Sequence, residues 1–399
     1  MQLAVTLEMH FKQTPDGKLW TPTMFPYIFW KRYLQVFESV KIIARTELVD
    51  ELNPEWKRVD GEGVSYVALP YYHGPVQYLR QRSSLQAILK QAICADDALL
   101  LRVPSIIATD CLTIFPHHPY GLEVVGDPYD VFAPNSVRHP LRNYFCWHSV
   151  RHLKRQCKNA LAVSYVTREA LQSRYPASHK AYQSSFSSVE LDDDAFTSQP
   201  RTYSTTPSPL RLCMVGTLEQ LYKAPDILLH ALHHLKTSHN LDVQLTLVGD
   251  GKYRPELETL SQQLDLMDNV RFTGMLSGGE AVRRQLDQSD LFVLPSRQEG
   301  LPRAMIEAMA RGLPCIGSTV GGIPELIPLE DCVPPGDIRA LANKIYEIST
   351  SADRLNTMAE RNWDTAHQYR NDILNRKRIE FYTYLRNTTD EYLRKQVTK

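Results

Sequence analysis

Two glutamates and a glycine-containing turn in the second half of the chain suit a ligand that carries both phosphates and hydroxyls. Seven residues separate Glu299 from Glu307, and Glu299 is followed by Gly300-Leu301-Pro302. Carboxylates accept hydrogen bonds from sugar hydroxyls. Backbone amides at a helix start, with the positive end of the helix dipole, suit a phosphate. The pattern indicates a nucleotide or sugar-phosphate site, although an isolated E-x7-E pair is more typical of a solvated helix face.

The segments around these glutamates alternate between strand and helix. An apolar run, 291–294, precedes the turn, and Pro302 suits the first helical position because its φ is fixed. A short strand at 315–317 follows, then a tight turn at 321–322, and Pro324 suits the start of another helix. This order is typical of the nucleotide-binding half of an α/β protein.

Length and composition limit the class of protein. The 399 residues predict two domains, and 43% apolar with 23% charged residues are ordinary for globular cores. A net charge of +0 argues against nucleic-acid binding, and no apolar run reaches the ~18 residues of a membrane span. The seven cysteines form no C-x-x-C pair, and the thirteen histidines are not spaced like the ligands of a metal ion. We therefore expect a cytoplasmic protein without a bound metal.

Strands and helices also alternate through the first half, which predicts a parallel α/β sheet. The expected strands are 3–7, 40–44, 64–69, 96–103, 123–126 and 160–166. A long loop, 8–24, and an aromatic segment, 25–37, that reads as a helix or a buried stretch follow the first of these strands. The expected helices are 79–93, 106–114 and the basic stretch 144–159.

Three charged residues fall at or just beyond predicted strand ends in this half. Ligands of parallel sheets bind off the carboxyl ends of the strands, which singles out Glu8, Arg102 and Asp127. Arg102 would face a phosphate or an acidic acceptor, and Asp127 the reacting sugar. The alternative, that Arg102 and Asp127 pair charges or cap a helix, stays open.

The segment 184–209 is rich in Ser, Thr, Pro and Asp, as expected of an interdomain connection. Its Asp192-Asp193-Asp194 contains a D-x-D pattern that can hold a divalent ion, but it does not end a strand. A second set of elements follows. We expect strands at 210–215, 243–248, 270–272 and 290–294, and helices at 224–235, 256–266 and 280–288. Lys223 ends the first loop of this half, where a cation suits a diphosphate.

Taken together and in order, several segments carry a family resemblance. VGTLEQLYKAPDILLHAL, LTLVGDGKY, NVRFTGML and SDLFVLPSRQEGLPRAMIEAMARGLPCIGSTVGGIPELI resemble the donor domain of the retaining nucleotide-sugar glycosyltransferases of glycosyltransferase family 4. DALLLRVPS and EVVGDPYDVF are similar to segments of bacterial exopolysaccharide and capsule transferases. The resemblance implies a GT-B fold: two Rossmann-like parallel-sheet domains across a cleft, 1–200 and 209–374, with a tail, 375–399, that returns to the first.

The resemblance also implies roles for residues of the donor domain. Glu307 matches the glutamate that holds the ribose hydroxyls. Glu299, with the amides of Gly300 and Leu301, matches the group around the donor hexose and diphosphate, and Lys223 matches the cation on that diphosphate. We expect catalysis to depend on Glu299.

Other matches are less direct. Met275 falls where the backbone meets the base. Thr217 stands where the family often has an arginine, so one cation on the diphosphate would be missing unless Arg102 or another arginine supplies it. Gly126-Asp127 stands where many members have a histidine after a first-domain strand, which makes Asp127 the candidate acceptor-side catalytic residue.

The function implied is transfer of a sugar from a nucleotide diphosphate to a hydroxyl acceptor with retained anomeric configuration. No cofactor or obligatory metal is expected. The acceptor would be a glycan or a lipid-linked glycan, the latter with peripheral contact at the inner face of a membrane, for which 151–158 and 25–37 are candidates. Two alternatives remain: a non-catalytic nucleotide- or glycan-binding assembly partner, and a nucleotide-sugar epimerase of the same fold.

Overall fold

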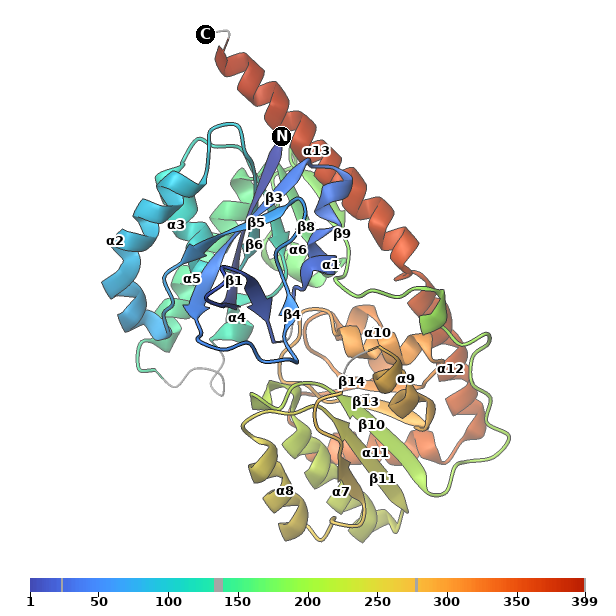
Figure 1. Ribbon diagram of the computed structural model, residues 1–399. Coiled ribbons are helices and arrows are strands. Elements are labelled where there is room, and N and C mark those ends of the chain that lie inside the picture. The colour runs from blue at the N-terminus through green and yellow to red at the C-terminus, as the bar shows by residue number, and fades with distance from the viewer. Residues whose placement is uncertain (23, 133–138, 277–278, 398–399) are drawn as a thin grey trace.

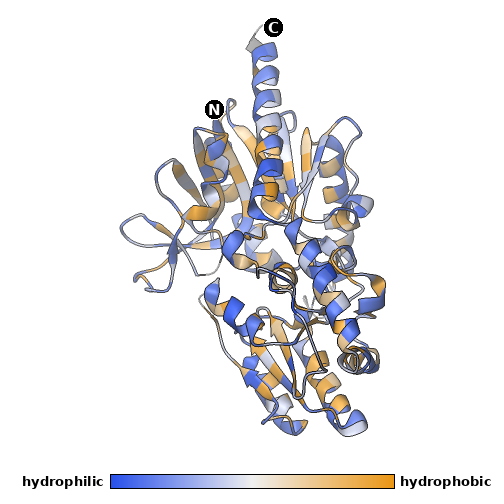
Figure 2. Cartoon of the chain, turned by 90° about the vertical axis from the view of Figure 1, so that its right-hand side faces the viewer, coloured by the Kyte–Doolittle hydropathy of each residue, from blue (hydrophilic) through white to orange (hydrophobic). Residues whose placement is uncertain are grey.

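The computed structural model of the chain describes residues 1–22, 24–132, 139–276 and 279–397. Two α/β domains, each built on its own sheet, lie one above the other in Figure 1. In Figure 2 the strands are largely coloured as hydrophobic, whereas the helices carry both hydrophilic and hydrophobic residues. Among the described helices, none has both the length and the apolar character that crossing a bilayer requires.

The first sheet is parallel except at one corner. Its parallel strands lie in the order β5-β3-β1-β6-β7-β8-β9, and β2 and β4 add an antiparallel extension to β1. The strands are β1 (Gln2–Gln13), β2 (Leu19–Thr21), β3 (Ser39–Leu48), β4 (Lys57–Arg58), β5 (Val64–Leu69), β6 (Ala98–Val103), β7 (Tyr120–Val124), β8 (Ala162–Tyr165) and β9 (Tyr182–Ser185).

Every residue of β6 and β7 is buried, because helices cover both faces of this sheet. The helices of this domain are α1 (Tyr27–Trp30), α2 (Gly74–Ala92), α3 (Ile106–Ile114), α4 (Pro128–Val131), α5 (Arg142–Asn159) and α6 (Ala170–Arg174). A 3-10 turn, Tyr33–Gln35, follows α1, and both lie in the aromatic segment 25–37. Trp30 and Tyr33 there are fully buried, so this segment belongs to the core.

Two expectations about the ends of this domain are wrong. The loop expected at 8–24 begins later, because β1 continues to Gln13 and its second half pairs with both β3 and the antiparallel β2. The connection expected from residue 184 onward overlaps β9, an edge strand with a polar sequence.

The second sheet is wholly parallel, in the order β12-β11-β10-β13-β14-β15. Its strands are β10 (Leu210–Val215), β11 (Val243–Val248), β12 (Val270–Phe272), β13 (Leu291–Leu294), β14 (Cys315–Ser318) and β15 (Cys332–Val333). Its helices are α7 (Pro225–His239), α8 (Arg254–Gln263), α9 (Glu280–Asp287), α10 (Arg303–Ala310), α11 (Ile338–Ser349) and α12 (Ala352–His367). The helix expected from Pro324 is only a 3-10 turn, Ile323–Glu325.

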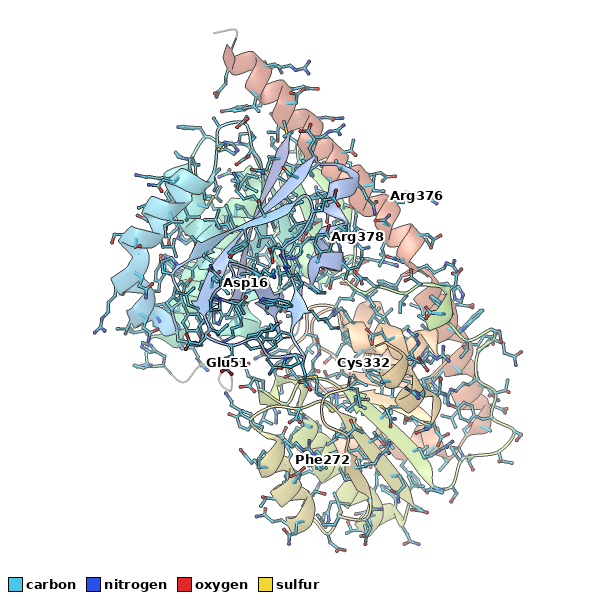
Figure 3. The ribbon with its side chains drawn as sticks, in the orientation of Figure 1. Asp16, Glu51, Phe272, Cys332, Arg376 and Arg378 are labelled. Atoms are coloured by element: carbon cyan, nitrogen blue, oxygen red, sulfur yellow. The ribbon has the colours of Figure 1, made fainter. Side chains whose placement is uncertain are left out.

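The last helix, α13 (Asn371–Val397), leaves the second domain and packs on β6 to β9 of the first. Phe381, Tyr382 and Leu385 are buried there. Arg378, labelled in Figure 3, donates hydrogen bonds to the carbonyls of Ser187 and Val189 at 2.8 and 3.2 Å. The first domain therefore takes its core from both ends of the chain, while the boundaries 1–200 and 209–374 stay a prediction.

Candidate functional site

The carboxyl ends of the strands in both domains border one cleft of about 1040 Å³. The first domain contributes the surroundings of α4 and α6, and the second contributes the loops after β10, β13, β14 and β15. The lining residues are Tyr129, Asp130, Lys154, Ser173, Arg174, Tyr175, Tyr222, Arg297, Gln298, Thr319, Val320, Gly321, Pro335 and Gly336. Parallel sheets bind ligands at this edge, so the cleft is the candidate site.

Lys223 and Glu299, widely separated in sequence, form an ion pair beside this cleft. Their strands, β10 and β13, are neighbours at the point where the strand order of the second sheet changes direction, the usual ligand position in such sheets. Both side chains are largely buried, and Ser296 Oγ donates a second hydrogen bond to Glu299 Oε1 at 2.9 Å. Their chain neighbours Tyr222 and Gln298 line the cleft.

The backbone around this pair explains why small residues stand there. A Cβ at Gly216 would lie 3.3 Å from Cγ of Lys223, whose side chain passes along this glycine. Gly321 has φ +52°, and a Cβ there would lie 1.7 Å from the carbonyl oxygen of Glu299. Gly322 N donates to Gly300 O at 2.6 Å. The turns after β13 and β14 therefore support each other through backbone contacts that side chains would block.

Glu307 lies in α10 and has neither a hydrogen bond nor an ion pair to another described side chain. Burial raises the pKa of its carboxyl, and Arg303 and Arg283 offset this only in part. Glu307 is half-buried, so a carboxylate without protein donors remains there that can accept hydrogen bonds from ligand hydroxyls. Leu301 and Gly300 lie in the turn before α10, and Leu301 is buried.

Thr217 and Met275 lie in loops at the same edge of the second sheet. Thr217 Oγ1 accepts a hydrogen bond from Glu219 N at 3.1 Å, which shapes the turn after β10. Met275 follows β12 and is 63% exposed. Its neighbour Gly274 bridges to Gly249 after β11, so three adjacent strand ends converge here.

Asp127 occupies a different position from the one expected. Its carboxylate caps α4 through Tyr129 N at 2.9 Å and accepts hydrogen bonds from Arg174 and from the Tyr175 hydroxyl. Only 4% of Asp127 is exposed, and it does not line the cleft. The structure therefore corrects the expectation that Asp127 meets the sugar: it caps a helix and orients Arg174.

The acidic residue that does line the cleft is Asp130, which the sequence analysis missed. Burial, and then the negative charge of Asp127, raise the pKa of Asp130 to about 7, and Glu299 across the cleft adds to this shift. Arg174 opposes it. The available signal was the spacing D-x-x-D after β7, which places the second carboxylate one helical turn beyond the first.

Arg102 and Glu8 serve the fold of the first domain and do not line the cleft. Arg102 forms a buried ion pair with Glu123, because its side chain points from the face of β6 toward α13 and not off the strand end. Glu8 accepts hydrogen bonds from the backbone N–H groups of Ile106 and Ile107 at 2.8 and 3.0 Å and so caps α3. The expectation that Arg102 faces a phosphate or an acidic acceptor is corrected accordingly, and Glu8, also singled out as a ligand-site candidate, caps a helix instead.

Arg174 and Arg297 line the cleft instead, together with Lys154. Arg174 is 56% exposed and held by Asp127. Arg297 forms a two-fold hydrogen-bonded ion pair with Asp226, at 2.8 and 2.6 Å, at the start of α7. Sequence patterns around the two arginines gave no indication of this position, because each is placed by a tertiary ion pair.

Glu325 joins the two domains beside the cleft. Its carboxylate accepts hydrogen bonds from the backbone N–H groups of Arg168, Glu169 and Ala170 at 2.5, 3.1 and 2.8 Å. These are the unpaired donors at the start of α6. A residue of the second domain thus caps a helix of the first, and it fixes α6 and its Arg174 at the cleft wall.

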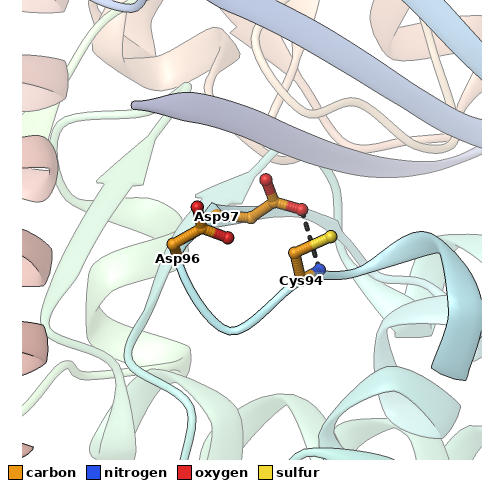
Figure 4. A group of neighbouring side chains, drawn as sticks. All are labelled: Cys94, Asp96 and Asp97. Carbon is orange, nitrogen blue, oxygen red and sulfur yellow. Dashed lines mark hydrogen bonds between the residues drawn. The ribbon is translucent and has the colours of Figure 1, made fainter.

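Two other clusters of acidic residues already form ion pairs or hydrogen bonds within the protein. Cys94, Asp96 and Asp97 have potential ligand atoms within 4.8 Å of one another (Figure 4), but Asp97 pairs with Lys41 at 3.0 Å and accepts from Cys94 N. This group precedes β6, at the opposite sheet edge from the cleft. In the D-x-D segment, Asp193 pairs with Arg370 and Asp194 with Arg283.

Comparison with known proteins agrees with this architecture. Residues 209–351 match the family described as Glycosyl transferases group 1. Protein CapJ of Staphylococcus aureus is 25% identical over 386 residues, 94% of each chain. The putative colanic acid biosynthesis glycosyltransferase WcaL of Escherichia coli K12 is 31% identical over 189 residues, which are 45% of this chain and 46% of WcaL.

Solved structures show the fold at low sequence identity. Anabaena Alr3699/HepE in complex with UDP and glucose superposes with a TM-score of 0.64 at 16% identity, covering 95% of this chain and 98% of that one. WaaG, a glycosyltransferase involved in lipopolysaccharide biosynthesis, gives a TM-score of 0.65 at 17% identity, covering 96% and 99%. Residues 209–351 therefore resemble a group 1 glycosyltransferase domain, and the chain as a whole has the GT-B fold.

Proposed function

We propose that the protein transfers a sugar from a nucleotide diphosphate to a hydroxyl of a glycan or lipid-linked glycan, with retained anomeric configuration. The observation that carries this proposal is the Lys223–Glu299 pair at the switch point of the second sheet, beside a cleft lined by both domains. The complexes of HepE with UDP and glucose support a donor of this class.

The second domain would hold the donor. Lys223 and the amides of Gly300 and Leu301 would contact the diphosphate, and Glu307 would accept hydrogen bonds from the ribose hydroxyls. These contacts give Glu307 the donors that the free protein does not supply. Thr217 and the backbone of Met275 would complete the site around the diphosphate and the base.

The first domain would hold the acceptor. Asp130 lines the cleft opposite Glu299 and, as a carboxylate, would accept a hydrogen bond from the attacking hydroxyl. Arg174 would supply the cation that Thr217 does not. Asp127 acts through Arg174, as a positioning residue.

The reaction would run on one face of the sugar. The bond between the anomeric carbon and the diphosphate oxygen breaks, the acceptor oxygen forms the new bond, and the departing phosphate takes the acceptor proton. Lys223 and the turn amides stabilise the negative charge that develops on the leaving group. We therefore expect turnover without added divalent metal, which an assay in EDTA will check.

Relatives point to a biological setting. CapJ aligns over nearly the full chain, and WcaL is named for colanic acid biosynthesis. We infer a role in bacterial polysaccharide or glycoconjugate assembly on the cytoplasmic side of the membrane. WcaL, which is named a glycosyltransferase, supports neither of the two alternatives, a non-catalytic assembly partner or an epimerase.

The deciding experiment screens nucleotide sugars by thermal shift and then assays the stabilising donor for transfer and hydrolysis. A ligand at 100 times its Kd raises the free energy of unfolding by about 2.7 kcal/mol. We expect one base to stabilise the wild type and Glu307→Ala to lose the shift while remaining folded. Donor binding without turnover on any glycan, or no donor binding at all, would overturn the enzyme proposal.

A further inference from the structure

One face of α5 carries an unusual set of exposed side chains. At about 100° per residue, Tyr144, Trp147, Arg151, Lys154, Arg155 and Lys158 fall within roughly a 100° arc, and all six are exposed. We call them the α5 face. The opposite side of the helix, with Val150, Leu153 and Cys157, is buried on the domain. The α5 face therefore points away from the core of the first domain and toward solvent.

The charge of this helix is one-sided. α5 contains five arginines and lysines and no aspartate or glutamate, in a chain whose net charge is +0. None of the four cations on the α5 face forms an ion pair with a described carboxylate, although cations elsewhere in the protein commonly do. Arg151 lies 5.8 Å from the ring centre of Trp147. These cations lack counter-ions within the described chain.

Apolar side chains extend the aromatic end of this face. Val131 of α4 and Leu141 before α5 are 49% and 55% exposed, beside Tyr144 and Trp147 at 55% and 57%. α4 packs against α5, so these side chains lie at one corner of the domain. An aromatic and aliphatic corner followed by uncompensated cations is the pattern of a helix that lies in the interface of an anionic bilayer.

We propose that the α5 face and its apolar corner dock the protein on a membrane that contains anionic lipid. Lys154 of the α5 face and Tyr129 of α4 also line the cleft, so a docked membrane would lie next to its mouth. This inference rests on the proposed function, in which the acceptor is a lipid-linked glycan. The other candidate from the sequence is the aromatic segment 25–37, but its Phe29, Trp30, Tyr33 and Phe37 are buried in the core, so it is not the main contact.

The test is cosedimentation of the full-length protein with two sets of vesicles. One set is phosphatidylcholine alone, and the other also contains about 30% phosphatidylglycerol as the anionic lipid. Each basic residue near an anionic surface strengthens binding by roughly fivefold. The triple variant Arg151→Gln, Arg155→Gln, Lys158→Gln is therefore expected to lose roughly 100-fold in partitioning. Lys154 is left intact because it lines the cleft.

The matched control removes the same charge elsewhere. Lys236→Gln, Lys252→Gln and Arg284→Gln lie on the second domain, with side chains 44%, 59% and 66% exposed. We expect this control to bind like the wild type, and Trp147→Ala to weaken binding even at high salt, where charge is screened. Equal loss in the control, equal binding to neutral vesicles, or binding of soluble heparin but not of vesicles would overturn the proposal.

A separate measurement distinguishes failure of the docking proposal from failure of the transferase proposal. The thermal shift by nucleotide sugar is expected to be the same in the wild type and the triple variant, because none of the three substituted residues lines the cleft. If the protein binds vesicles but no nucleotide sugar raises its thermal midpoint, the docking proposal stands and the transferase proposal fails. If a nucleotide sugar raises the midpoint but the protein does not bind vesicles, the docking proposal fails and the transferase proposal stands.

Discussion

The Lys223 ammonium donates a hydrogen bond to the Glu299 carboxylate, and the two residues reach each other from the loops that follow β10 and β13. Each is the largely buried counter-ion of the other, so neither charge is isolated in the free protein. An incoming diphosphate would meet a lysine that is already oriented. Organisation of this kind before the reaction is the main source of electrostatic catalysis.

Substituting Lys223 by alanine will test this organisation. We expect the transfer rate to fall by roughly 100- to 1000-fold, the usual cost of removing one group that stabilises transition-state charge. Glu299 would also be left without its counter-ion, so the thermal midpoint should fall. Lys236→Ala, in the same domain but on its surface, is the control. Transfer within a few-fold of wild type in Lys223→Ala would contradict the assignment.

Glu307→Gln separates binding from stability. Because burial raises the pKa of Glu307, the folded state holds that proton more tightly than the unfolded chain, and stability is lost as pH rises above the ordinary value of 4.5. Glutamine removes this loss, so we expect a variant that is more stable at neutral pH but binds donor less tightly. Calorimetry at pH 5 and 8, with donor titrations, checks both; tighter donor binding would refute the role.

Asp130 should set the pH dependence of the reaction. With a pKa of about 7, its carboxylate forms as pH rises through neutrality, and kcat/KM should rise with it. Asp130→Asn should flatten the profile and lower the rate by roughly 100-fold. The exposed Asp268→Asn serves as the control. A wild-type profile that falls above pH 7, or an unchanged inflection in the variant, would show that another group titrates.

The same residue has a linked effect on folding. The folded-state pKa of Asp130 is raised from 3.8 to about 7, so its contribution to stability is full below pH 3.8 and lost as pH rises through 7. Asp130→Asn should therefore unfold at a higher temperature than the wild type at pH 8. Thermal scans at pH 5 and 8 measure this difference, which should be smaller at pH 5.

Glu325→Ala should loosen the cleft. The substitution removes the cap on α6, whose hydrogen bonds to a charged acceptor are each worth about 1.5–3 kcal/mol. We expect small-angle scattering to report a larger radius of gyration and kcat/KM to fall by roughly tenfold or more. Glu330→Ala removes a surface carboxylate that pairs with Arg354 and should change neither. An unchanged radius with full activity would mean that Glu325 does not hold the domains.

The second domain was largely predictable from the sequence, and the GT-B fold is confirmed. Three strands, 210–215, 243–248 and 270–272, match β10, β11 and β12 residue for residue, because strands of a parallel sheet read as apolar runs between turn residues. In the first domain, the helix expected at 106–114 has the same bounds as α3. Lys223 and Glu299 were each named as candidate site residues, and their roles stay a prediction; their contact with each other was not predicted.

The remaining differences have tertiary causes. The second half of β1 alternates polar and apolar residues and is a strand because β2 and β3 pair with it. Arg102 was placed at a strand end, but one residue of β6 follows it, so its side chain points into the layer under α13. Asp130 and Arg174 gain their positions from the Asp127 and Glu325 contacts, which connect segments that no local pattern relates.

The placement of α13 has a consequence for how the protein is made. Leu385 lies against Gly121 of β7, and Tyr382 donates a hydrogen bond to the buried Glu123 at 2.8 Å. During synthesis the N-terminal half emerges from the ribosome long before these residues exist. Its sheet therefore keeps an uncovered apolar surface while the second domain is made, so early chain termination would yield an aggregation-prone product.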